Sequence, residues 1–268
     1  MLRELLLWLT TPCPPYVRRM RYLYQLIAMH GRYRRNRSSW QQHLSRTRDF
    51  ILSSTERCRS HERVVVLGSG LLLDIPLKEL SARFRTVVLV DIVHLPEILK
   101  QITGYPNVRL VQCDIMGAAE ALYDSIRRGK GVLPHAIPFF PEVDEETGLL
   151  ISLNVLSQLS AVPYDYVMRK MPNCDEDALV AWGNTVRSAH LQALEQSPAD
   201  VCLITDYSYS WRSVAGELLE EGSTVGNIAL PVPAAFWTWH IAPIGEISKK
   251  WSKDLTVGAW FMSKSNPQ

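Results

Sequence analysis

The sequence has few cysteines, and none of them is placed for a disulfide or a zinc site. The five cysteines are dispersed, with no C-x-x-C pair and no cluster with histidine: Cys13, Cys58, Cys113, Cys174 and Cys202. An odd and scattered set argues against a disulfide scaffold and indicates a reducing compartment. We therefore expect a cytoplasmic protein that holds no metal.

Long apolar runs are missing as well. No run approaches the roughly 18 residues that a membrane-spanning helix needs. The opening MLRELLLWL contains only a short apolar stretch and carries Glu4, which makes it a poor secretory signal. The sequence also shows no internal repeat and no low-complexity tract. These absences predict neither a membrane protein nor a repeat protein.

Lysine is absent from residues 1–60, although the segment is strongly basic. It holds twelve arginines and three acids, a balance of +9, whereas the whole chain has a net charge of +2 and the rest therefore carries −7. Apolar spacing predicts helices near residues 2–9 and 16–30, a turn at GRYRRNRSS, and a third helix capped by Ser38 or Ser39. We expect a helical extension, either a lid over the site, a nucleic-acid surface, or a structural addition whose arginines coat a solvated face.

What the sequence does contain is a series of buried strands with special residues at their ends. With 47% hydrophobic residues, the chain can bury an ordinary globular core. Residues 64–67 run into Gly68-Ser69-Gly70, residues 87–90 run into Asp91, and residues 108–113 run into Asp114. Short apolar runs separated by helical stretches are typical of a parallel sheet, where ligands bind beyond the carboxyl ends of the strands.

This series resembles the class I S-adenosylmethionine-dependent methyltransferases over residues 63–264. The resemblance implies that the acid after the second strand binds the ribose hydroxyls and that the acid after the third lies near the adenine. Asn154, in the run NVLSQL after the fourth strand, would face the methionine moiety. The implied cofactor is S-adenosyl-L-methionine, and the implied cofactor residues are Gly68, Ser69, Gly70, Asp91, Ile92, Asp114, Ile115 and Asn154.

The loop after the first strand departs from a dinucleotide motif. The third glycine of G-x-G-x-x-G would fall at Leu73, and Asp74 follows, placed to cap a helix over residues 75–84. A carboxylate at that helix N-terminus would disfavour the pyrophosphate of NAD. The loop therefore favours S-adenosylmethionine over NAD.

The second half of the chain completes the predicted fold. We expect a proline-rich loop at residues 129–146, strands at 148–153 and 201–205, helices at 175–196 and 211–221, and an antiparallel hairpin within 237–262. The fold class is α/β, with a Rossmann-like, mostly parallel seven-stranded sheet flanked by helices. Residues 1–60 form the helical extension, and residues 61–268 the methyltransferase domain.

The acceptor site is less defined. Tyr164 and Tyr207 are candidate substrate contacts, while Gln158 stands where the resembled family often has a histidine and cannot act as a general base. No catalytic residue is named. The favoured function is methyl transfer to a small molecule or peptide. A non-catalytic binding protein of the same fold, an RNA methyltransferase and an NAD-dependent oxidoreductase remain as alternatives.

Overall fold

The computed structural model describes residues 2–264, so the last four residues of the predicted domain lie outside the described part. The elements are α1 (Leu2–Thr10), α2 (Pro15–Arg19), α3 (Tyr22–Arg35), α4 (Arg37–Arg57), β1 (Arg63–Leu67), α5 (Leu77–Arg83), β2 (Thr86–Asp91), α6 (Pro96–Ile102), β3 (Val108–Gln112), α7 (Ala119–Arg127), β4 (Thr147–Leu153), α8 (Ala161–Lys170), α9 (Glu176–Gln196), β5 (Asp200–Ser213), β6 (Leu218–Ser223), β7 (Ala235–Ala242) and β8 (Trp251–Met262). No helix among the described residues is both long and apolar enough to cross a bilayer.

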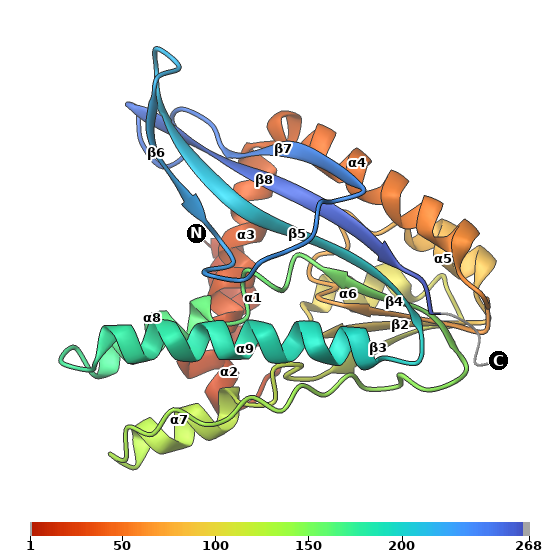
Figure 1. Ribbon diagram of the computed structural model, residues 1–268, viewed down its shortest axis with the longest axis horizontal. Coiled ribbons are helices and arrows are strands. Elements are labelled where there is room, and N and C mark those ends of the chain that lie inside the picture. The colour runs from red at the N-terminus through yellow and green to blue at the C-terminus, as the bar shows by residue number, and fades with distance from the viewer. Residues whose placement is uncertain (1, 265–268) are drawn as a thin grey trace.

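One mixed sheet runs through the molecule in the order β3-β2-β1-β4-β5-β8-β7 (Figure 1). Strands β1 to β5 pair in parallel, and β8 pairs antiparallel with both β5 and β7. The predicted terminal hairpin and the Rossmann-like fold class are therefore confirmed. Strand order reverses between β1 and β4, which is the position where such sheets bind ligands.

The predicted helix at residues 211–221 is wrong. Strand β5 continues to Ser213, pairs with β8 along its whole length, and turns into β6, which pairs with β5 as an eighth strand. Aromatic residues at alternate positions, Tyr207, Tyr209 and Trp211, carry the period of a strand. Pairing with β8 keeps this segment extended. The apolar residues Leu218 and Leu219 nearby led to the prediction of a helix instead.

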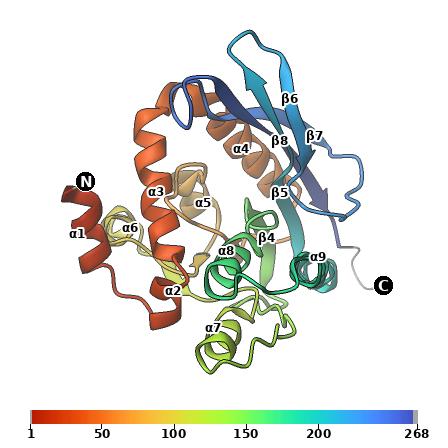
Figure 2. The same cartoon turned by 90° about the vertical axis from the view of Figure 1, so that its left-hand side faces the viewer.

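Side chains alternate between two cores on opposite faces of the sheet. Val64 and Val66 of β1 pack with residues of α1 to α6, while Val65 and Leu67 pack with residues of α7 to α9. Figure 2 shows these helical layers on either side of the strands. The N-terminal helices share the first core, because Ile51 of α4 is buried in it.

The N-terminal helices differ from their predicted bounds. Residues 16–30 contain a break, where Arg21 adopts a φ of +79° between α2 and α3. The predicted turn at residues 31–39 is helical except at Asn36, and α4 begins at Arg37 without a side-chain cap from Ser38 or Ser39. Asn36 makes the junction instead, because its Nδ2 donates to the carbonyl of Arg32 at 3.0 Å. The same carbonyl accepts from the backbone amide of Asn36 at 3.0 Å, so both groups of Asn36 close the end of α3.

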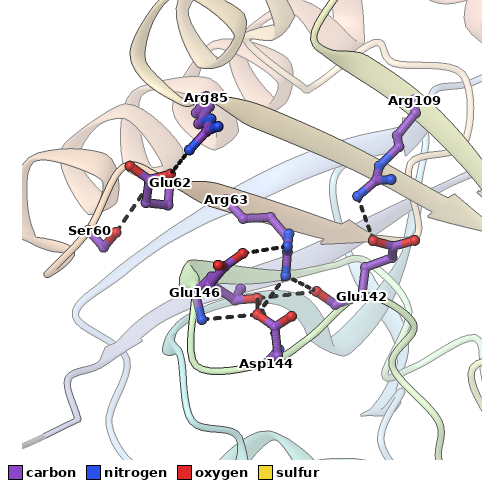
Figure 3. A network of polar contacts seen from close by, with 9 residues as sticks. Ser60, Glu62, Arg63, Arg85, Arg109, Glu142, Asp144 and Glu146 are labelled. Atoms are coloured by element: carbon purple, nitrogen blue, oxygen red, sulfur yellow. Dashed lines mark hydrogen bonds and ion pairs between the residues drawn. The ribbon is translucent and has the colours of Figure 1, made fainter.

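An ion-pair network fixes the proline-rich loop to the amino ends of the strands (Figure 3). Arg63 of β1 bonds Asp144 at 2.5 Å and Glu146 at 3.0 Å, and Arg109 of β3 bonds Glu142 at 2.5 Å. These carboxylates thus lie at the edge of the sheet opposite the predicted ligand site.

Candidate functional site

A cavity of about 290 Å³ lies beyond the carboxyl ends of β1, β2 and β4. Its walls combine the loops after these strands with α3, α4 and β7. All eight residues that the sequence predicts for the cofactor line it: Gly68, Ser69, Gly70, Asp91, Ile92, Asp114, Ile115 and Asn154. Residues distant in sequence are therefore brought to one place by the parallel strands.

The glycine loop requires glycine at its first position. Gly68 has a φ of +82°, and an added Cβ would lie 2.2 Å from Cγ1 of Val155 and 2.6 Å from the carbonyl of Leu153. The amides of Gly68 and Ser69 both donate to the carbonyl of Val90, at 2.9 and 3.1 Å. The Oγ of Ser69 is buried without a partner among the described residues. The loop thus closes tightly on β2 and leaves a hydroxyl available.

Asp91 joins the end of β2 to the glycine loop. Its Oδ2 accepts from the amide of Gly70 at 2.7 Å, and its Oδ1 accepts from the amide of Ile92 at 2.8 Å. Burial raises its pKa, against the opposing effect of His94. A carboxylate has about four lone-pair sites, so each oxygen keeps capacity for a ligand hydroxyl.

Asp114 organises the turn into α7. Its carboxylate accepts from the amides of Met116 at 3.1 Å, Ala118 at 3.0 Å and Ala119 at 2.8 Å. Burial raises its pKa, and these amide bonds lower it. The three donors hold the carboxylate in place and set the position of Ile115 on the cavity wall.

Asp74 does not cap α5, contrary to the sequence prediction. The helix begins at Leu77 after Pro76, with no side-chain cap. The carboxylate of Asp74 instead accepts from Nδ2 of Asn154 at 2.9 Å, and both residues line the cavity. Burial raises the pKa of Asp74 to about 6. The shift arises because desolvation disfavours the charged form more than the nearby donors stabilise it.

Asn154 itself sits in an uncommon backbone conformation. Its φ is +52°, and its amide donates to the carbonyl of Ile204 at 2.8 Å, which holds the end of β4 against β5. Asparagine tolerates this left-handed region better than most residues. Its Oδ1 is buried without a partner in the described chain, so an acceptor stands unused beside the Asp74 carboxylate.

Asp206 lies in the middle of β5, shortly beyond the residues that pair with β4, and lines the cavity, although the sequence analysis left it out of the site. It is 2% exposed, accepts from Oγ of Ser157 at 2.6 Å, and has its pKa raised by burial. Like Asp91 and Asp114, it follows a short run rich in apolar residues, and that shared pattern could have identified it. Gln158 also lines the cavity, where an amide side chain offers no titrating base.

The far end of the cavity is aromatic, which the sequence analysis did not anticipate. Trp40 and His43 come from α4, and Trp239 comes from β7. The rings of His43 and Trp239 stack with centroids 3.9 Å apart, and Trp40 meets Trp239 edge-on at 4.9 Å. No sequence motif joins these residues, because they meet only when α4 packs on the terminal hairpin.

The two tyrosines proposed as substrate contacts lie outside the cavity lining. The hydroxyl of Tyr164 donates to Glu176 at 2.5 Å, and Tyr207 packs edge-on against Trp260. The structure does not bring either one together with the other predicted residues. His190 of α9 also lies outside the cavity lining, where it is buried and hydrogen-bonded to Oγ of Ser152 at 3.0 Å.

The charged side chains that line the cavity are all acidic. The described residues that line it include the four carboxylates of Asp74, Asp91, Asp114 and Asp206, and neither lysine nor arginine. No group of three or more possible metal ligands occurs in residues 2–264. Such a site attracts a ligand with positive charge and disfavours an anion, since attraction is strong where water is excluded.

The sequence matches no protein-family model and no curated protein. Solved structures give partial matches. A complex of DhpI with SAH is 14% identical, covering 87% of this chain and 94% of that one, with a TM-score of 0.35. The 23S rRNA methyltransferase ErmE is 14% identical, covering 82% and 69%, with a TM-score of 0.32. A precorrin 8W decarboxylase from Methanobacterium thermoautotrophicum is 11% identical, covering 81% and 89%, with a TM-score of 0.31. Likenesses at these scores do not identify a function.

Proposed function

We propose that the protein binds S-adenosyl-L-methionine in this cavity and transfers its methyl group to a small acceptor molecule. One observation carries the proposal. The eight residues that the sequence resemblance assigns to the cofactor line a single cavity, whose charged side chains are all carboxylates. S-adenosylmethionine has a sulfonium and an ammonium group, which suit that charge.

Each part of the cofactor has residues that fit it. We assign the ribose hydroxyls to Asp91, which keeps acceptor capacity beyond its two amide bonds. The adenine lies on the side of Asp114, against Ile92 and Ile115. The methionine end lies along the glycine loop toward Asn154, whose unpartnered Oδ1 is an acceptor for the ammonium group.

The same features count against a nicotinamide dinucleotide. A pyrophosphate needs donors or cations, as at a helix N-terminus. Here α5 begins beyond Asp74, and that carboxylate lies on the cavity wall. The third glycine, which permits close helix packing in dinucleotide sites, is replaced by Leu73.

The chemistry demands little of the protein beyond positioning. S-adenosylmethionine, when bound, supplies a methyl group already activated on sulfur. The protein's residues hold the cofactor and acceptor in line and exclude water from the space between them. Apolar side chains of α3 and α4, including Leu26 and Leu44, line the cavity and serve the second purpose. Asp206 is the carboxylate placed to take a proton if the acceptor must lose one.

Calorimetric titration tests the cofactor assignment. We expect micromolar binding of S-adenosylmethionine and S-adenosylhomocysteine to the full-length protein, no binding of NAD, and at least a tenfold weaker affinity in Asp91→Asn. The matched control is Asp144→Asn, which removes a carboxylate at the opposite edge of the sheet. Failure of both S-adenosyl compounds to bind the wild-type protein would refute the proposal.

A further inference from the structure

The aromatic end of the cavity carries two hydrogen-bond donors that nothing in the described chain uses. His43 is 1% exposed and Trp239 is 7% exposed. Both line the cavity, and their rings are parallel to within 2°. Nε2 of His43 and Nε1 of Trp239 are each buried without a partner among residues 2–264. Buried polar groups are nearly always hydrogen-bonded, so two neighbouring exceptions call for an explanation.

The proton of His43 is fixed on Nε2. Nε1 of Trp237 donates to Nδ1 of His43 at 3.0 Å, which requires a lone pair on Nδ1. Burial also lowers the pKa of His43 to about 3, so the ring is neutral at physiological pH. A neutral imidazole that accepts at Nδ1 carries its proton on Nε2. Both unpartnered nitrogens are therefore donors.

The surroundings define what these donors can bind. The wall here is apolar, with Leu26 and Met29 of α3 and Leu44 of α4. The described lining offers no cation to balance a negative ligand, while Asp206 lies on the same cavity wall. A neutral oxygen satisfies the two donors without placing a second negative charge near that carboxylate.

We propose that this end of the cavity binds the methyl acceptor, a small neutral molecule with an apolar, ring-sized body and an oxygen that accepts hydrogen bonds from His43 and Trp239. The inference rests on the proposed function, because it places the acceptor beside the cofactor. The aromatic faces of Trp40 and Trp239 provide the contact surface for the body. The two donors orient the body so that its reactive atom faces the glycine loop.

The test compares two model ligands that differ in one oxygen. The full-length protein is saturated with S-adenosylhomocysteine, and binding of acetophenone and ethylbenzene is followed by tryptophan fluorescence and calorimetry. We expect acetophenone to bind about tenfold more tightly, as one good hydrogen bond predicts. We expect benzoate, which is anionic, to bind more weakly than acetophenone.

Variants show which nitrogens are responsible. Trp239→Phe removes a donor that has no partner in the chain, so we expect the tenfold preference to fall to about twofold with S-adenosylhomocysteine affinity unchanged. The control, Trp260→Phe, makes the same change on β8, outside the cavity lining, where Nε1 donates to Pro231. It should keep the preference. The double variant His43→Phe with Trp237→Phe removes the His43 donor together with Trp237, whose Nε1 would otherwise lose its acceptor. It should also reduce the preference for acetophenone over ethylbenzene.

Failure of this inference differs from failure of the proposed function. If S-adenosylhomocysteine binds but acetophenone shows no advantage over ethylbenzene, the acceptor assignment is overturned and the cofactor assignment stands. The same holds if Trp239→Phe and Trp260→Phe change the preference equally, or if S-adenosylhomocysteine and acetophenone compete. Loss of S-adenosylhomocysteine binding by the wild-type protein would overturn both.

Discussion

The side-chain amide of Asn154 donates to the carboxylate of Asp74 across 2.9 Å, joining the loops that follow β4 and β1. The pair presents a carboxylate with a pKa of about 6 and an unused amide oxygen in the same cavity. An ammonium group bound there favours ionised Asp74, since opposite charge stabilises the charged form. We therefore expect S-adenosylhomocysteine affinity to be constant above pH 6 and to decrease below it, approaching tenfold per pH unit.

Two comparisons isolate Asp74 in calorimetric titrations from pH 5 to 8. Asp74→Asn should weaken binding about tenfold at pH 7.5, in line with a hydrogen bond to a charged group, and should flatten the pH dependence. The ligand 5′-methylthioadenosine lacks the ammonium group and should bind wild-type protein with little change over this range. An equal slope for both ligands would show that Asp74 does not contact the amino group.

Substitution at Gly68 separates backbone strain from steric clash. Alanine there must adopt a φ of +82° and also overlaps Val155 and the Leu153 carbonyl. Gly129→Ala is the matched control, because Gly129 has a φ of +70° with open space around it. We expect Gly129→Ala to lower the free energy of unfolding by about 1 kcal/mol and Gly68→Ala by about 1–3 kcal/mol more. Urea denaturation measures both, and equal losses would contradict the close approach of Val155.

The sequence predicts the half of the cavity that we assign to the cofactor, because its residues follow local patterns. Each of Asp91, Asp114 and Asn154 stands at the carboxyl end of a strand, and parallel pairing places these strand ends at one edge of the sheet. The period of the side chains therefore determines both the strands and the positions of the functional residues. Asp206 follows a short run rich in apolar residues and was predictable in principle.

The half of the cavity that we assign to the acceptor could not be predicted in this way. His43 lies in a helix of the arginine-rich segment, and Trp239 lies in the terminal hairpin, 196 residues away in the sequence. Their contact depends on how α4 packs across β7, which no local period encodes. The helix predicted at residues 211–221 was wrong for the same reason, since β8 determines the length of β5. Tertiary contacts override local preference in both cases.

The buried His190 makes the free energy of unfolding depend on pH. Burial lowers its pKa to about 3 from an ordinary value near 6.5. As the pH falls, the unfolded chain therefore binds a proton at His190 at a higher pH than the folded protein does. The stability that the neutral residue contributes above pH 6.5 is lost as the pH falls toward 3. The loss is on the order of 5 kcal/mol by the linkage relation. We expect urea denaturation at several pH values to show a shallower acid decline for His190→Gln than for wild type.

The comparison of these two proteins cancels the contributions of the other titrating groups. His190→Gln should be less stable at pH 7, because it disturbs the bond to Ser152 and the contact with Phe140. Its deficit should shrink as the pH falls. His135→Gln, at an exposed position, is the control. A deficit that stays constant from pH 7 to pH 4 would show that His190 is not held neutral in the folded protein.

Most of the N-terminal arginines bind groups within the protein, which bears on the RNA methyltransferase alternative. Nine of the twelve contact a residue of another element through side-chain hydrogen bonds, ion pairs or a ring face: Arg3, Arg18, Arg21, Arg32, Arg35, Arg37, Arg48, Arg57 and Arg59. Three of these bind carboxylates, because Arg3 pairs with Glu97 and both Arg32 and Arg35 pair with Glu246. An arginine engaged in this way is not available to a phosphate without breaking a contact.

We therefore expect the wild-type protein not to bind a short single-stranded RNA at 50 mM salt, as measured by fluorescence anisotropy. The double variant Glu97→Gln with Glu246→Gln releases up to three arginines for phosphate contacts. Because each contact contributes about −0.7 to the slope of log affinity against log salt for single strands, the variant should show a slope no steeper than about −2. A steeper slope for the wild-type protein would mean that many more arginines reach phosphate together. In that case α1 to α4 would form a nucleic-acid surface, and an RNA acceptor would replace the small molecule.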